Sequence, residues 1–204
     1  EGRNFEIRKT LLKFDDVMND QRKVIFGQRL EILETQEVKK MIFSFLDEIN
    51  KNLELAHQNF KKNNNLKIFS NEVKANYGNV FDEKKIESFS KMKEKELVKN
   101  LVNSFEEKRN ERINILGEKQ NNEIEKRIFL QIMDFLWRSH LQYLEQLRQV
   151  VGLRSYGQKD PLAEFRREAF QLFEGLLFKI KVETVKFLIN TNIVVEEKMD
   201  KYKK

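Results

Sequence analysis

The chain has 204 residues and a formal net charge of +6, with 35% charged and 40% hydrophobic residues. It contains no cysteine, which excludes disulfides and thiolate metal sites and is compatible with a reducing compartment. No run of about 18 apolar residues occurs, so we predict no membrane-spanning helix. The chain has seven glycines, one proline and no sustained alternation of polar and apolar residues, and we therefore predict an all-α fold.

The N-terminal part of the chain predicts two helices and then a less regular stretch. Residues 4 to about 34 carry apolar side chains at helical spacing, and a second helix begins near Val38. Residues 61–65 have the composition of a loop. Residues 66–81 are the least regular stretch, with turn-forming residues around Gly78.

Two further helices are expected before the C-terminal third. Asp82 is suited to cap a short helix, because its side chain can accept a hydrogen bond from a free amide of the first turn. A longer helix follows from about residue 93 to residue 116. Gly117 and the pair Asn121-Asn122 are expected to interrupt the helical pattern after it.

Residues 121–190 predict an antiparallel helical hairpin. Apolar residues recur at helical spacing on both sides of a short loop at residues 152–159. Asp160 and Pro161 are a favourable N-cap and first helical residue. Each arm reaches roughly 40 Å at 1.5 Å per residue. We expect the first helix to lie along this hairpin and to bury Leu11 or Leu12 against it.

Two separated parts of the chain resemble the SecA family of bacterial preprotein translocase motor ATPases. The C-terminal part resembles the two-helix finger of SecA, and the N-terminal part is similar to the start of the SecA helical scaffold domain. The finger-like runs are Leu136-Trp137-Arg138-Ser139-His140-Leu141, Leu147-Arg148-Gln149, Leu153-Arg154-Ser155-Tyr156-Gly157-Gln158-Lys159-Asp160-Pro161 and Phe165-Arg166-Arg167-Glu168-Ala169-Phe170. The scaffold-like runs are Arg3-Asn4-Phe5-Glu6-Ile7-Arg8-Lys9 and Asp15-Asp16-Val17-Met18-Asn19-Asp20-Gln21-Arg22.

The resemblance implies a division of the chain into four parts. Residues 1–40 are expected to form the long helix of the scaffold, and residues 118–192 its two-helix finger. Residues 41–117 carry no motif of the family, and only their position between the two matching parts predicts a small helical wing subdomain. Residues 193–204 form a charged tail. The first residue is not methionine and no apolar signal region follows it, so we expect a fragment of a longer protein.

The resemblance also implies partners for two sets of residues. The finger loop of SecA approaches the SecYEG channel and the unfolded preprotein, which assigns this contact to Arg154, Ser155, Tyr156, Gly157 and Lys159. Arg148, Arg166 and Arg167 near the base of the loop are weaker candidates. The scaffold helix of SecA docks on the motor domains of the same protein, for which the candidates are Arg8, Asp15, Asp16 and Arg22. The expected location is the bacterial cytoplasm and the cytoplasmic face of the inner membrane, as a peripheral protein.

No catalytic or cofactor site is predicted within the chain. It lacks a Gly-x4-Gly-Lys-Ser/Thr phosphate loop, so ATP and Mg²⁺ are expected only in motor domains outside it. His57 and His140 have no second ligand at helical spacing that predicts a metal. Trp137 is expected to pack within the hairpin. The sequence leaves two roles for Tyr156 in the predicted loop: a residue that contacts a partner, or a side chain folded back on its own hairpin.

Two alternatives to a SecA-like coupling module remain. A self-standing helical adaptor or oligomerising scaffold would show a sustained heptad, whereas the apolar steps here drift between three and four residues. The positive charge permits binding to nucleic acid or to anionic lipid. Lysines and glutamates are interleaved along most of the predicted helices, as on solvated faces, so we do not favour nucleic acid.

Overall fold

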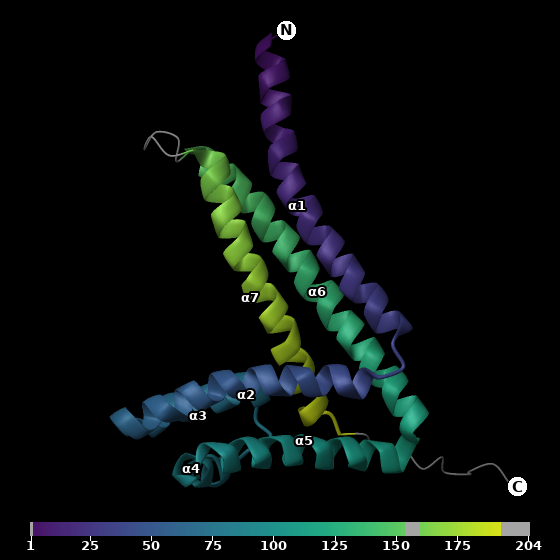
Figure 1. Cartoon of the computed structure of the whole chain (residues 1–204), viewed down its shortest axis with the longest axis vertical. Coiled ribbons are helices and arrows are strands. Elements are labelled where there is room, and N and C mark those ends of the chain that lie inside the picture. The colour runs from purple at the N-terminus through teal and green to yellow at the C-terminus, as the bar shows by residue number, and fades with distance from the viewer. Residues whose placement is uncertain (1, 154–159, 193–204) are drawn as a thin grey trace, which may run out of the picture. The chain divides into compact units, whose positions relative to one another are not determined.

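The computed structural model describes residues 2–153 and 160–192, and among them the side chains of residues 9, 11–151 and 160–192. This part of the chain is all-α, as predicted, and contains seven helices and no strand (Figure 1). Their bounds are α1 (Gly2–Glu34), α2 (Val38–Asn63), α3 (Leu66–Tyr77), α4 (Glu83–Lys91), α5 (Glu94–Leu116), α6 (Glu118–Leu153) and α7 (Pro161–Asn190). None of these helices is long and apolar enough to cross a bilayer.

The chain divides into two compact units, each built from separated segments. We call the first the hairpin unit; its described part contains α1 with the residues up to Val38, α6 from Lys126 and α7 up to Thr184. The second, which we call the wing unit after the subdomain predicted for residues 41–117, contains residues 39–125 and, of the described C-terminal residues, 185–192. The first two turns of α6 and the last turn and a half of α7 therefore belong to the wing unit. The four-part division expected from the sequence stays a prediction.

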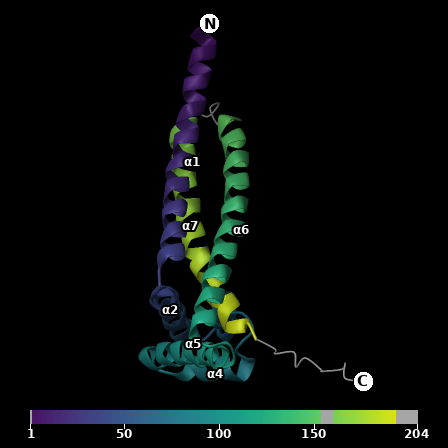
Figure 2. The same ribbon diagram turned by 90° about the vertical axis from the view of Figure 1, so that its right-hand side faces the viewer.

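In the hairpin unit, α6 and α7 run in opposite directions and α1 lies along them (Figures 1 and 2). Phe14 of α1 packs into a cluster with the hairpin residues Leu144, Leu147, Val151, Phe165 and Ala169. The rings of Phe14 and Phe165 meet edge to face, with their centroids 5.0 Å apart. The predicted hairpin and the predicted position of the first helix along it are both confirmed.

The expected burial of Leu11 or Leu12 is wrong. Their side chains are 46% and 62% exposed, whereas Phe14 is buried. The buried positions of α1 are Phe14, Gln21, Ile25 and Ile32, which follow one another by seven, four and seven residues. This spacing defines one stripe of the helix, and Leu12 lies almost opposite to it. Since α1 carries apolar residues on both faces, the sequence pattern could not show which face is covered.

The wing unit is built around α2–α5, with α3 and α4 packed together. Its fully buried side chains come from all four helices and include Ile42, Leu46, Phe69, Phe89, Leu101 and Phe105. The expected short helix is confirmed as α4, and the Asp82 side chain accepts a hydrogen bond from the Lys85 amide at 2.7 Å.

Three local predictions for the wing unit and the start of the hairpin need correction. Residues 66–77 form a regular helix, α3, because Asn65 caps its first turn and Phe69 and Val73 are buried. The predicted loop is shorter than residues 61–65, since α2 continues to Asn63. Gly117 does end a helix, but Asn121 and Asn122 lie inside α6, where Asn121 is fully buried.

Candidate interaction surfaces

The candidate channel-contact residues lie at the loop between α6 and α7. Arg154, Ser155, Tyr156, Gly157 and Lys159 all fall outside the described residues. The helix ends on either side are described: α6 ends at Leu153 and α7 begins at Pro161. The Asp160 carboxylate accepts a hydrogen bond from the Leu162 amide at 3.0 Å, so the predicted cap of α7 is confirmed.

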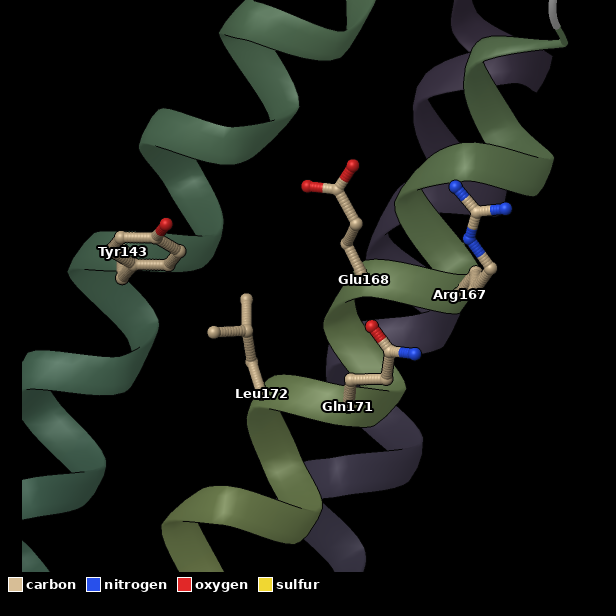
Figure 3. A pocket seen from close by; sticks show the side chains of 5 residues that line it. All are labelled: Tyr143, Arg167, Glu168, Gln171 and Leu172. Carbon is tan, nitrogen blue, oxygen red and sulfur yellow. The ribbon is translucent and has the colours of Figure 1, made fainter.

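Below the loop, a shallow hollow of about 630 Å³ lies between the two hairpin helices. It is lined by Tyr143 of α6 and by Arg167, Glu168, Gln171 and Leu172 of α7. Figure 3 shows Tyr143 facing Leu172 across the hollow, with the Glu168 carboxylate pointing into the gap. The Arg167 guanidinium donates to the Glu164 carboxylate at 2.8 Å. An aromatic ring, an aliphatic side chain and an acid in one hollow can receive apolar and basic side chains of a polypeptide.

The candidate docking residues of α1 divide between the hairpin and solvent. The Arg148 guanidinium donates to the Asp15 carboxylate at 3.1 Å, so Asp15 is ion-paired within its own unit. Asp16 and Arg22 are exposed and line a second shallow hollow together with Phe26. Arg8 lies in α1, and its side chain is outside the described set. Asp15 and Asp16 thus show the solvated or ion-paired state that their adjacent helical positions favour.

A stripe of exposed apolar residues, missed as a surface by the sequence reasoning, lies on the same helix. Phe26, Leu30 and Leu33 are 56%, 54% and 52% exposed, and they follow the i, i+4, i+7 spacing of one helix face. Together with Asp16 and Arg22 we call them the outer face of α1. The sequence signal for this face was that the charged residue Arg22 lies four residues before Phe26, on the same side of the helix.

Buried polar side chains join α1 to both helices of the hairpin. The Gln21 amide donates to the Ala169 carbonyl at 3.0 Å, and its oxygen lies 2.8 Å from His140 Nε2. That oxygen can only accept, so His140 Nε2 carries the proton and donates. Burial lowers the pKa of His140 to about 4, which keeps the ring neutral near pH 7.

Trp137 and His140 act as packing residues within the hairpin. Trp137 is buried, as expected, and its ring contacts those of Phe173 and His140 at centroid distances of 6.4 and 5.6 Å. Within the described part of the chain, no group of histidine and acidic side chains is arranged to hold a metal ion.

Comparison with known proteins identifies the family. The profile of the family described as SecA Wing and Scaffold domain matches residues 1–192. The chain belongs to this SecA family. The resemblance to SecA predicted from the N-terminal and C-terminal parts of the sequence is confirmed.

Several SecA relatives match almost the whole chain. A protein translocase subunit SecA from Pelagibacter ubique is 51% identical over 197 residues, which cover 96% of this chain and 23% of the relative. The corresponding subunit from Hyphomonas neptunium is 35% identical, covering 95% of this chain and 21% of the relative. Protein translocase subunit SecA 1 from Magnetococcus marinus is 38% identical, covering 99% and 23%. The chain thus spans less than a quarter of the length of these SecA proteins.

Proposed function

We propose that this chain is the scaffold, wing and finger portion of a SecA-type protein translocase. Motor domains outside these residues bind ATP and Mg²⁺, and this portion couples hydrolysis to the movement of unfolded preproteins through the SecYEG channel. Residues 1–40 and 118–192 act as the scaffold with its finger, residues 41–117 as the wing, and residues 193–204 as a charged tail. The protein works in the bacterial cytoplasm and peripherally at the cytoplasmic face of the inner membrane.

The portion itself is not the catalyst in this proposal. None of its seven glycines is followed by lysine, so the Gly-Lys pair of a phosphate loop is absent from the sequence. The residues present do not fit a nucleotide site of that type. We therefore derive the role of the chain from its mechanical contacts alone.

The observation that carries the proposal is the polar seam between α1 and the hairpin. Asp15 pairs with Arg148, Gln21 bonds to His140 and Ala169, and Arg29 pairs with Asp134. From Asp15 to Arg29 these contacts extend over about 20 Å of helix at 1.5 Å per residue. Sliding α1 along the hairpin would break all of them together. A load on α1 is therefore passed to the hairpin rather than lost in relative motion of the helices.

The two ends of this relay are the outer face of α1 and the loop of the hairpin. The outer face presents Phe26, Leu30 and Leu33 beside charged groups, a combination suited to docking against another domain. We assign this contact to the motor domains, with Arg8, Asp15, Asp16 and Arg22 as its polar residues. At the other end, we assign Arg154, Ser155, Tyr156, Gly157 and Lys159 to contact with the channel or the preprotein.

The proposal is tested in the full-length protein by the change Tyr156→Ala. We expect less preprotein transported per ATP hydrolysed, while basal ATP hydrolysis stays close to the wild-type value, because the nucleotide site lies in other domains. Phe170→Ala is the matched control, since Phe170 is an exposed aromatic residue of α7 that does not line the hollow below the loop. Unchanged transport per ATP in the Tyr156 variant would remove the loop from the mechanism.

The proposed contact between the outer face of α1 and the motor domains is tested separately. Phe26→Ser should alter the ATP hydrolysis of the full-length protein, because it removes an apolar contact with the motor domains. Val24→Ser is the control on the same helix: Val24 is also exposed but lies on another face. Equal effects of the two changes would show that the outer face is not the docking surface.

A further inference from the structure

The wing unit buries three charged side chains in one cluster. Arg109 and Arg112 of α5 and Glu125 of α6 are only 2%, 3% and 0% exposed. Arg109 Nε lies 3.0 Å from the Glu125 carboxylate, and Arg112 Nη2 lies 3.2 Å from it. Charges buried this deeply are costly unless each is paired and hydrogen-bonded, so the three side chains must be kept in register with one another.

The two arginines differ in what else they hold. Arg109 donates to the start of α6, to the Glu125 carboxylate and to the Asn122 oxygen at 2.7 Å. Arg112 donates to the Asn121 oxygen at 3.2 Å and, through Nη1, to the Leu188 carbonyl at 2.6 Å. One planar guanidinium therefore connects α5, the start of α6 and the end of α7.

The Leu188 carbonyl is an acceptor that α7 itself cannot satisfy. The helix ends at Asn190, so it contains no amide four residues after Leu188. Such terminal carbonyls carry partial negative charge. The Leu188 carbonyl at the end of α7 therefore helps to offset the second positive charge of the cluster, in which the two arginines share one carboxylate.

A second contact holds the same end of α7. The side-chain amide of Asn190 donates through Nδ2 to the main-chain carbonyl of Tyr77 at 2.7 Å, at the turn that follows α3. Gly78 leaves room for it: a Cβ at this position would lie 2.7 Å from Asn190 Nδ2. Gly78 also has a φ of 71°, which disfavours other residues. Val185, Leu188 and Ile189 are buried beside these polar contacts.

We propose that Arg112 is a positioning residue that holds the last turn of α7 in the wing unit. Glu125 and Asn121 orient the guanidinium, and Nη1 then binds a main-chain carbonyl, so the contact does not depend on the side chain at position 188. The end of the second hairpin helix is thereby placed by a residue that lies 76 positions earlier in the sequence. This inference does not depend on the proposed coupling function.

Hydrogen–deuterium exchange on the full-length protein tests the inference. In Arg112→Met, the amides of residues 185–190 should exchange at least about tenfold faster than in the wild type, since a charge-assisted hydrogen bond is lost. Arg109→Met is the matched control, because it removes an equally buried arginine of the same helix that pairs with the same glutamate. Its amides at 185–190 should stay within about threefold of the wild type, while those around Asn122 and Glu125 exchange faster.

Arg112→Lys keeps the test decisive if the methionine variant opens the whole wing unit. Lysine retains the charge, but its single ammonium group cannot reach Asn121, Leu188 and Glu125 together in the guanidinium geometry. We expect faster exchange at 185–190 with most of α2–α4 unchanged. The inference is overturned if exchange at 185–190 is unchanged in the lysine variant, or if the Arg109 variant loosens this segment as much as the Arg112 variants do.

Discussion

The hairpin unit and the wing unit differ in the buried polar side chains that hold their separated segments together. Each must hold segments that are far apart in the sequence, and each does so with buried polar side chains. The hairpin unit uses neutral groups, with Gln21 placed between His140 and Ala169. The wing unit combines neutral contacts such as Asn190 to the Tyr77 carbonyl with full charges, Arg109 and Arg112 around Glu125. Breaking a neutral hydrogen bond costs a modest part of the unfolding free energy. Removing one partner of a charged cluster costs more, because it leaves an uncompensated buried charge.

The largest expected effect comes from removing the carboxylate of the wing cluster. Glu125→Gln keeps the shape of the side chain but removes the carboxylate that the two buried arginines share. We expect a loss of about 3–5 kcal/mol in unfolding free energy, measured by denaturant titration. Asp20→Asn is the control, because Asp20 pairs with Lys23 at the exposed surface of the hairpin unit and should contribute less than about 0.5 kcal/mol. A loss below about 1 kcal/mol at Glu125 would contradict the contrast between the units.

The next effect tests which face of α1 is buried. Phe14→Ala should cost about 3 kcal/mol, because the ring fills the cluster around Phe165 in the hairpin unit. Leu12→Ala, on the exposed face, should cost less than about 0.5 kcal/mol. Thermal unfolding of both variants gives the comparison. Similar losses of unfolding free energy at the two positions would mean that α1 buries a face of the helix other than the one that carries Phe14.

A pH experiment separates the neutral network from the charged one. The pKa of His140 is lowered from 6.5 to about 4 in the folded state, so the unfolded state binds the proton more readily. This contribution to stability is complete above pH 6.5 and is lost as the pH falls toward 4. Between pH 7.5 and 5 we expect a loss of about 2 kcal/mol from this residue. The wild type should show this loss relative to His140→Gln, and parallel pH profiles of the two proteins would refute it.

The smallest expected effect on stability is at the hairpin loop. Tyr156→Ala should change the unfolding free energy by less than about 0.5 kcal/mol, because a loop-tip side chain has few neighbours. Calorimetry of the variant provides the value. A loss above about 1.5 kcal/mol would make Tyr156 a packing residue and would favour a side chain folded back on its own hairpin.

Local patterns predicted much of the helical structure. The Asp160–Pro161 start of α7, the Asp82 cap of α4 and the end of α5 before Gly117 depend on neighbouring residues, and all three are confirmed. The turn predicted around Gly78 is confirmed, but the irregular character assigned to the rest of residues 66–81 was wrong for residues 66–77. The local propensities of α3 are weak, and burial of Phe69 and Val73 decides its state. Tertiary packing overrides weak local preference in such stretches.

The candidate surfaces were only partly accessible from the sequence. The finger loop was assigned through its resemblance to SecA, and its residues stay a prediction. Burial was predicted for the wrong face of α1, at Leu11 or Leu12, because these leucines fit a helical stripe as well as Phe14 does. The Arg112 contact with Leu188 could not be predicted, since a main-chain carbonyl carries no signature in the sequence.

The sequence by itself determined the all-α class, the long first helix, the hairpin and the family of this chain. Each depends on periodicity, caps or continuous motifs, which are local properties. Only the tertiary structure decided which face of α1 is buried, that Asn121 belongs inside a helix, and that two arginines share one glutamate at the end of α7. These outcomes depend on which distant groups exclude water from one another, and burial of that kind is a property of the packed chain.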